Sequence, residues 1–165
     1  LFNAFATLHT NYPNAHICII WATDGAWYDC LVEQIATLGL SSQVSFLGYQ
    51  DNVVACLQML DLFVLPSRAE ALSLSLLEAC SVGLPVIGAN VGGVPEIITD
   101  GVNGFLFESD SSDALALVLE RLLADEPLRQ KLGSAAKSTH TNHFSEGKMV
   151  EETVAIYRQM LVSAG

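Results

Sequence analysis

The chain has 165 residues, of which 51% are hydrophobic, and it carries a formal net charge of −11 at pH 7. This length supports one domain with a single core and is too short for two full α/β domains. The negative charge argues against nucleic acid or an anionic membrane surface as a partner of this chain. The sequence contains no run of 18 apolar residues, so no transmembrane helix is predicted.

Short apolar runs alternate with helical patterns along the chain, as in repeated βα units. Strands are predicted over residues 17–21, 44–47, 62–65, 85–88 and 104–107. Helical spacing and end signals predict helices over residues 1–12, 26–38, 52–59, 74–82, 94–98, 112–124, 127–139 and 145–162. This order predicts an α/β fold with a parallel sheet covered by helices.

Two glutamates lie at the junction of a strand and a helix. Glu70 is in the loop after strand 62–65 and Glu78 is near the start of helix 74–82, with seven residues between them. Ligands bind beyond the carboxyl ends of parallel strands, so both carboxylates can face one cleft and accept hydrogen bonds from sugar hydroxyls. The spacing alone favours a plainer interpretation, in which Glu70 is an ordinary loop acid and Glu78 points to solvent.

Further motifs surround this pair in a fixed order. They are LFVLPS at 62–67, GLPVI at 83–87, VGGVPEI at 91–97 and DGVNG at 100–104. With the E-x7-E spacing, they resemble the carboxy-terminal domain of the group 1 family of retaining glycosyltransferases, which have the two-domain GT-B fold. The resemblance covers nearly the whole chain and implies a Rossmann-like parallel sheet sandwiched by helices, with a nucleotide-sugar site.

The resemblance implies roles for particular residues. The first glutamate of the motif contacts the donor sugar, which makes Glu70 the catalytic candidate, and the second binds the ribose hydroxyls, which is the role of Glu78. Relatives commonly carry Gly-Phe-Gly between them, and the donor-binding positions here read Ala71, Leu72, Ser73 and Leu74. Alanine is costly where a glycine had positive φ, so we expect a different loop geometry, although the helix N-terminus still offers amides to phosphate.

Three more segments border the implied donor site. Gly48 and Tyr49 match the loop beside the nucleotide base, although an aromatic there is otherwise a packed rim residue. Gly92-Gly93 match a segment that shapes the pocket, while amides offered to phosphate are the alternative. Residues 21–25 match a Gly-Asp-Gly turn of which only Asp-Gly survives, so we expect no phosphate contact from them.

The resemblance also implies parts that this chain lacks. Relatives place a strand and a loop with an arginine and a lysine before the first helix, and an amino-terminal acceptor-binding domain before those. Arg68 is the only basic side chain before residue 121, against thirteen acidic ones. We therefore expect residues 1–165 to be a single donor-binding domain and a fragment. The absent strand would lie between strands 17–21 and 62–65, exposing two sheet edges unless these strands pair directly.

We predict that the parent protein is a hexosyltransferase that transfers a sugar from a nucleotide diphosphate, UDP or GDP, to a hydroxyl acceptor with retention of configuration. The acceptor is a glycan, a lipid-linked sugar or a small molecule, as in polysaccharide biosynthesis. No cofactor or metal is expected, and we expect the isolated chain to be inactive. The expected location is cytoplasmic, with membrane association of the parent left open.

Two other functions stay compatible with these residues. The absent cations and Ala71 are consistent with a non-catalytic module that binds a nucleotide sugar or a protein. A GT-B sugar-nucleotide epimerase shares the fold and acts on the donor alone. A nicotinamide-binding domain is disfavoured because no G-x-G-x-x-G follows a strand.

The cysteines and histidines suggest no other chemistry. The four cysteines show no C-x-x-C pattern and are predicted to be reduced core thiols of a cytosolic protein: Cys18, Cys30, Cys56 and Cys80. His140 and His143 lie beside a helix end without cysteine or acid at ligand spacing, which indicates solvated surface and no metal.

Overall fold

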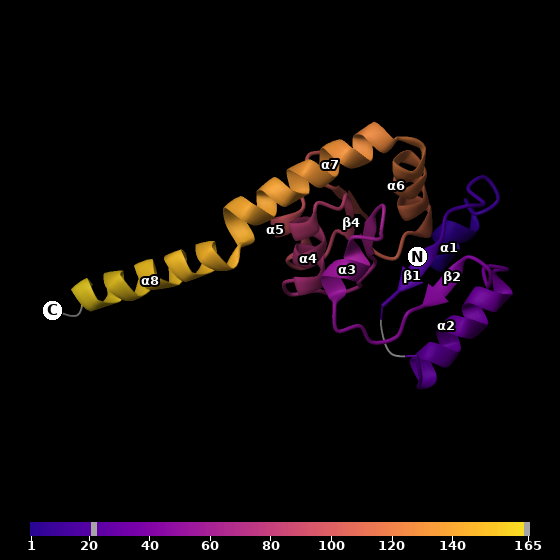
Figure 1. Ribbon diagram of the computed structural model, residues 1–165, viewed down its shortest axis with the longest axis horizontal. Coiled ribbons are helices and arrows are strands. Elements are labelled where there is room, and N and C mark those ends of the chain that lie inside the picture. Colours follow the sequence, from indigo (N-terminus) through magenta and orange to yellow (C-terminus); the bar gives the residue numbers. More distant parts are fainter. Residues whose placement is uncertain (21–22, 164–165) are drawn as a thin grey trace.

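A computed structural model describes residues 1–20 and 23–163 of the chain (Figure 1). The strands are β1 (Ile17–Ile19), β2 (Val44–Phe46), β3 (Phe63–Leu65), β4 (Val86–Ala89) and β5 (Phe105–Phe107). The helices are α1 (Phe2–Ala6), α2 (Ala26–Thr37), α3 (Val53–Leu57), α4 (Leu74–Val82), α5 (Val94–Ile97), α6 (Ser112–Ala124), α7 (Glu126–Thr139), the π-helix η1 (His140–Phe144) and α8 (Glu146–Ser163). The predicted alternation is present, although Trp21 of the first predicted strand lies outside the described residues.

The parallel sheet is divided into two parts. β1 pairs with β2, and β4 pairs on one side with β3 and on the other with β5, all in parallel. Phe63 lies opposite Val86, and Ile87 lies opposite Phe105. Within the described residues no ladder joins β1 to β3, so the direct pairing considered above does not form. β4 is buried along its whole length, whereas β1 and β2 are half-buried.

The short helix α1 connects the cores of the two sheets. Ala4 of α1, with Leu8 in the turns that follow the helix, packs in a cluster with side chains of β4, β5 and α6. Phe2 and Phe5 pack in a second cluster with side chains of α2, β1 and β2. The two sheets therefore share one packed body, with β1, β2 and α2 at one end (Figure 1).

The prediction of a helix over residues 1–12 is wrong beyond Ala6. Side chains after that point return to the backbone: the Thr7 hydroxyl donates to the Ala4 carbonyl at 2.8 Å, and His9 Nδ1 lies 2.8 Å from the Ala6 carbonyl oxygen. Such local bonds compete with helix continuation, and the chain passes through turns instead.

Helix α4 has the predicted bounds and follows the loop that carries Glu70. The Ser73 hydroxyl accepts a hydrogen bond from the Leu76 N–H at 3.3 Å, and Gly83 closes the helix with φ of +86°. Ser73 is therefore the N-cap of α4, and Gly83 is its C-cap in the left-handed conformation. The buried face of α4 joins the core that includes β3, β4 and α5.

The side chains of the DGVNG motif at residues 100–104 form hydrogen bonds that hold β5 and the end of α5 in place. Asp100 Oδ1 accepts a hydrogen bond from the Leu106 N–H at 2.8 Å, which satisfies a backbone donor of β5. The Asn103 side chain is 3% exposed and bonds to two backbone groups in residues 97–99 and to the Thr139 hydroxyl. Asn103 therefore ties the end of α5 to α7.

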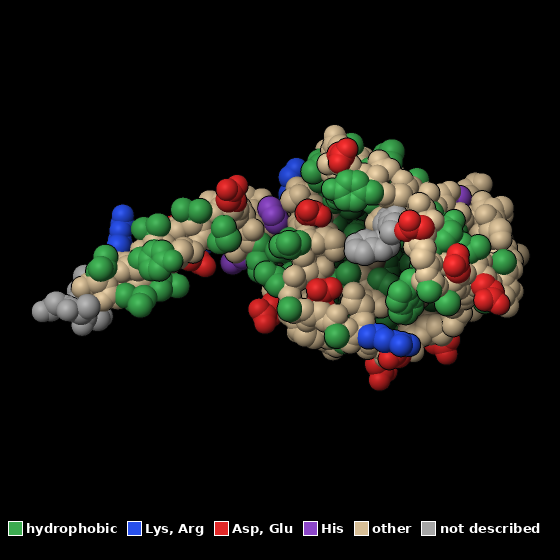
Figure 2. All heavy atoms as spheres, turned by 90° about the horizontal axis from the view of Figure 1, so that it is seen from below, with side chains coloured by type: hydrophobic (Ala, Val, Ile, Leu, Met, Phe, Trp, Pro, Cys, Tyr) green, Lys and Arg blue, Asp and Glu red, His purple; other side chains and the backbone are tan. Residues whose placement is uncertain are grey.

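Helix α8 projects from the body (Figure 1) and makes its main contacts with η1. Its exposed apolar side chains are Met149, Val150, Val154, Ile156, Tyr157, Met160 and Leu161. They are visible as green groups along the projecting arm, while acidic side chains are spread over the body (Figure 2). Within the described residues, no helix combines the length and apolar character needed to cross a membrane.

Candidate functional site

The loop of residues 66–73 begins at the carboxyl end of β3, where the chain leaves the buried Leu65. Glu70 is half-buried in this loop, and the Ser67 hydroxyl donates to Glu70 Oε2 at 3.4 Å. The loop then enters α4 at the Ser73 cap. The carboxylate of Glu70 therefore lies beside the start of a helix, at the edge of the sheet where ligands bind in parallel α/β folds.

Glu78 lies on the exposed face of α4. Leu74, four residues earlier, is 71% exposed on the same face, whereas Leu76, Leu77 and Cys80 are buried. Helical side chains tilt toward the helix N-terminus, so Glu78 leans back toward the loop that carries Glu70. The exposure of Glu78 is the feature that the plainer interpretation of the spacing predicted, and it also leaves the carboxylate accessible to a ligand.

The loop after β4 packs directly on the Glu70 loop. The Gly93 N–H donates to the Glu70 carbonyl at 3.3 Å. A Cβ atom on Gly92 would lie 1.7 Å from that same carbonyl oxygen, and one on Gly93 would lie 1.9 Å from the Ala71 carbonyl oxygen. The two loops therefore touch backbone to backbone.

The loop after β5 also reaches the Glu70 loop. Arg68 Nε donates to Asp110 Oδ1 at 2.7 Å, with both side chains largely exposed. Asp110 has φ of +63° and is the one non-glycine among the described residues with positive φ. Ala71 therefore avoids the left-handed strain that we considered for an alanine in place of glycine.

The other predicted donor-binding positions differ in accessibility. Leu72 and Leu74 are 47% and 71% exposed, whereas Ser73 is 4% exposed. The Ser73 hydroxyl accepts from the Leu76 N–H and lies 3.1 Å from the Ser75 hydroxyl oxygen, so this buried side chain is engaged within the chain. Backbone amides at the start of α4 are the groups that this segment can present.

Gly48 and Tyr49 lie on the other part of the sheet, after β2. The Leu47 N–H donates to the Ile19 carbonyl at 2.8 Å and continues the pairing of β1 with β2. Gly48 then turns with φ of +68°. Tyr49 is 86% exposed, so it is not the packed rim residue that we considered as the alternative.

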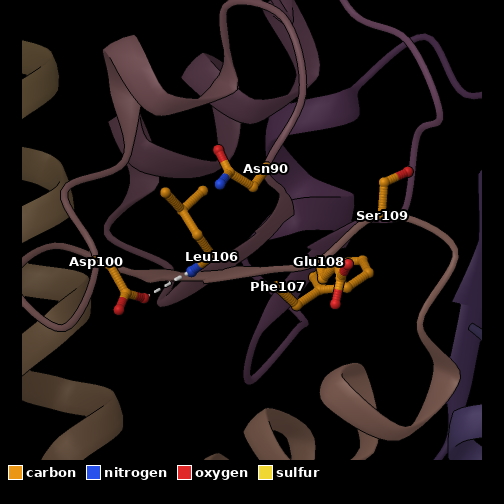
Figure 3. A pocket seen from close by; sticks show the side chains of 6 residues that line it. All are labelled: Asn90, Asp100, Leu106, Phe107, Glu108 and Ser109. Carbon is orange, nitrogen blue, oxygen red and sulfur yellow. Dashed lines mark hydrogen bonds between the residues drawn. The ribbon is translucent and has the colours of Figure 1, made fainter.

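An open hollow of about 530 Å³ lies at the outer edge of β5 (Figure 3). Its lining residues are Asn90, Asp100, Leu106, Phe107, Glu108 and Ser109. None of the predicted site residues lines it. Its two carboxylates disfavour an anionic diphosphate, and Asp100 is already bonded to the backbone of β5.

Positive charge is scarce around the candidate site. Arg68 is the only basic residue among the first 120, and it is paired with Asp110. Arg121 lies over the Phe105 ring, 4.8 Å from its centroid. Arg129 donates to carbonyl groups at the end of α6. These contacts leave little cationic charge for a diphosphate.

The cysteines are less uniform than predicted. Cys56 and Cys80 are buried and Cys18 is half-buried, but Cys30 is exposed on α2, so its prediction as a core thiol is wrong. Burial raises the pKa of the Cys80 thiol to about 11. Cys80 therefore stays protonated at neutral pH and is a poor nucleophile.

Comparisons with known proteins identify the family. Residues 1–139 match the family described as glycosyl transferases group 1. N-acetyl-alpha-D-glucosaminyl L-malate synthase of Bacillus anthracis is 37% identical over 138 residues, which are 84% of this chain and 36% of that protein.

Solved structures agree with this match. The C-terminal domain of the group 1 glycosyl transferase LpcC from Francisella tularensis is 28% identical, with a TM-score of 0.79 over 88% of this chain and 77% of that one. HepE of Anabaena, solved in complex with UDP-glucose, is 26% identical, with a TM-score of 0.84 over 94% of this chain and 44% of that one.

The chain belongs to the group 1 glycosyltransferases and corresponds to the carboxy-terminal domain of their GT-B fold. The predicted family and the predicted α/β fold with parallel strands flanked by helices are confirmed. The chain spans 36% of the N-acetyl-alpha-D-glucosaminyl L-malate synthase and 44% of HepE, so it is much shorter than either.

Proposed function

We propose that this chain binds the donor of a retaining glycosyltransferase, and that the donor is a uridine diphosphate sugar. The observation that carries the proposal is the anchored loop of residues 66–73, which holds Glu70 beside the start of α4, while Glu78 lies exposed in the same helix. Support for uridine over guanosine comes from HepE, whose structures contain UDP and UDP-glucose.

Each part of the donor has a proposed partner. Glu70 accepts hydrogen bonds from sugar hydroxyls, and Glu78 accepts them from the ribose. The first amides of α4, with the positive end of the helix dipole, face the diphosphate. Gly48 and Tyr49 border the base, and a bound base would cover the Tyr49 ring, which is exposed without a ligand.

The proposed reaction transfers the sugar to a hydroxyl group. The bond between the anomeric carbon and the diphosphate oxygen breaks, and its electron pair leaves with the nucleoside diphosphate. The acceptor oxygen bonds to the same face of that carbon, and its proton passes to the leaving phosphate oxygen. Glu70 stabilises the positive charge that develops on the sugar, an electrostatic contribution that exists mainly in the transition state.

We propose that this domain works with a second domain in a longer protein. The relatives are more than twice as long as the part that matches this chain. The second domain would bind the acceptor, whether a glycan, a lipid-linked sugar or a small molecule, and the strand and loop expected before the first helix would supply cations for the diphosphate. The low basic content of residues 1–120 supports this division.

Calorimetric titration of the protein, expressed from its natural gene, tests the donor assignment. We expect UDP to bind more tightly than GDP or ADP, and Glu78→Gln to weaken UDP binding about tenfold through loss of a charged hydrogen-bond acceptor. Glu120→Gln on α6 is the matched control and should leave binding unchanged.

The other outcomes separate the alternative functions. Binding of GDP or ADP in place of UDP would show that the donor carries guanine or adenine and not uracil. Binding of none of the three would overturn the proposal. UDP-sugar binding without transfer to any acceptor would identify a non-catalytic module. Conversion of the donor alone into an epimeric sugar nucleotide would identify an epimerase.

A further inference from the structure

The contact between the loops after β3 and β4 depends on two missing side chains. A Cβ on Gly92 would lie 1.7 Å from the Glu70 carbonyl oxygen and 2.9 Å from its carbon. A Cβ on Gly93 would lie 1.9 Å from the Ala71 carbonyl oxygen and 3.1 Å from its carbon. The obstructing atoms are backbone, so no rotation of a side chain could relieve the overlap. Any side chain at these positions must move one of the two loops.

The loop after β4 is the more firmly held of the two. It follows a fully buried strand, and Val91 N–H donates to the Ala89 carbonyl at 2.8 Å. It then enters α5 at Val94, which is 0% exposed in the main core. By contrast, the facing loop has exposed residues at 66, 68, 69, 71 and 72. A collision should therefore displace residues 66–72 and leave the loop after β4 in place.

Phosphate binding does not account for the two glycines. The Gly93 N–H is already engaged by the Glu70 carbonyl. Helix α5 has only four residues and so has a weak dipole. The position that a Cβ would take on either glycine is occupied by the backbone of residues 70–71.

We propose that Gly92 and Gly93 are positioning residues that set the location of the Glu70 carboxylate through its own backbone. This inference rests on the proposed function for its effect on the donor, because Glu70 is the proposed sugar contact. The glycines touch no substrate themselves. Because these residues have no side chains, the backbone of the Glu70 loop can pack directly on the loop after β4. The hydrogen bond from the Gly93 N–H to the Glu70 carbonyl fixes this position.

Another close glycine contact provides a matched control. A Cβ on Gly133 of α7 would lie 2.1 Å from the Gly83 carbonyl oxygen, which is the same kind of backbone collision at the other end of α4. Neither Gly93 nor Gly133 has positive φ, so alanine at either position is strained by the collision alone. For Gly92, with φ of +50°, the control is Gly39, with φ of +72° and nothing within 4 Å of a Cβ.

The experiment compares Gly93→Ala with Gly133→Ala in the protein expressed from its natural gene. Hydrogen exchange of the ligand-free protein should be faster over residues 66–76 in Gly93→Ala and unchanged there in Gly133→Ala. Calorimetry should show that Gly93→Ala weakens UDP-glucose binding about tenfold, while UDP itself binds nearly as before because Glu78 is not displaced. Gly133→Ala should keep the wild-type preference for UDP-glucose over UDP.

A double-mutant cycle separates positioning from general damage. Because both changes act through one carboxylate, Gly93→Ala combined with Glu70→Gln should bind UDP-glucose no more weakly than Glu70→Gln alone. Additive losses, or exchange over residues 66–76 that matches the wild type in Gly93→Ala, would overturn the inference. If Gly93→Ala does not fold, Gly92→Ala against Gly39→Ala answers the same question.

These measurements also distinguish the two proposals. If the wild-type protein binds no UDP sugar, the proposed function fails. The hydrogen-exchange data alone then decide whether the two glycines fix the position of the Glu70 loop. If the wild type binds UDP-glucose but Gly93→Ala binds it equally well, the proposed function stands and the positioning role fails.

Discussion

Arg68 donates from Nε to Oδ1 of Asp110 at 2.7 Å, and this ion pair joins the loop after β3 to the loop after β5. Together with the Gly93 hydrogen bond to Glu70, it means that the loops after all three strands of this sheet meet at the segment that carries Glu70. The candidate catalytic carboxylate is therefore supported from two directions by elements distant in sequence.

Two substitutions of Asp110 can distinguish the stability that the ion pair contributes from the cost of the positive φ at this residue. An exposed pair contributes about 1 kcal/mol at most. Glycine at a left-handed position relieves about 1 kcal/mol of strain that alanine retains. We therefore expect Asp110→Gly to be nearly as stable as the wild type in urea unfolding and Asp110→Ala to be about 1 kcal/mol less stable than Asp110→Gly. The reverse order of the two variants would contradict this account.

The two glutamates should have separable kinetic effects. Glu70→Gln is expected to lower kcat on the order of a hundredfold, because its interaction grows in the transition state. Glu78→Gln is expected to raise the KM for the donor about tenfold with a smaller change in kcat, because it supplies ground-state binding. Steady-state kinetics of the protein from its natural gene measures both values, and equal behaviour of the two variants would exclude this division of roles.

The buried Cys80 thiol predicts a loss of stability at alkaline pH. Its pKa is raised to about 11 in the folded protein, whereas a thiol in an unfolded chain titrates near 8.5. Between these values the unfolded chain releases a proton that the folded chain retains, so this contribution to the free energy of unfolding falls as pH rises.

Urea unfolding of the wild type and Cys80→Ala between pH 8 and 11 measures this effect. The stability difference between the two proteins should shift by about 2 to 3 kcal/mol across that range, in favour of the variant as pH rises. Cys30→Ala changes an exposed thiol and serves as the control. A pH-independent difference for Cys80→Ala would refute the assignment.

Asn103 is expected to matter for stability and not for binding. Its buried side chain donates to the Ile97 carbonyl at the end of α5 and to the Thr139 hydroxyl, and accepts from the Thr99 N–H. Asn103→Ala should reduce the free energy of unfolding by about 2 to 3 kcal/mol, because buried groups lose their partners. The exposed Asn14→Ala is the control. The variant should keep UDP affinity while it remains folded, and a selective loss of affinity would instead place Asn103 in the donor site.

Helix α8 should contribute little to the stability of the body. Its main contacts are with η1, and its apolar side chains are exposed. Deletion of residues 146–165 should change the free energy of unfolding by less than about 1 kcal/mol, whereas Leu132→Ala in α7, at a position 0% exposed, should cost about 2 to 5 kcal/mol. Binding of a hydrophobic dye should fall on deletion. A large loss of stability would show that α8 packs on the body in solution.

Local chemistry explains which elements could be predicted from the sequence. Helix α4 matches its predicted bounds because Ser73 and Gly83 carry their end signals within the segment itself. The first helix was predicted too long because its apolar spacing continues through Leu8, while Thr7 and His9 bond back to the chain. The π-helix η1 has no comparable local signal in the sequence, and in the structure it contacts α4, α7 and α8.

The sequence by itself determined the family, the βα order and the placement of Glu70 and Glu78 around one strand-to-helix junction, because these depend on residues close together in the chain. Only the tertiary structure decided that Gly93 lies against Glu70 and that Arg68 meets Asp110, 42 residues away. It also decided that, among the described residues, β1 and β3 do not pair directly across the gap expected between them. Contacts of this kind depend on how strands order themselves in a sheet, and hydrophobic patterning within single elements does not encode that order.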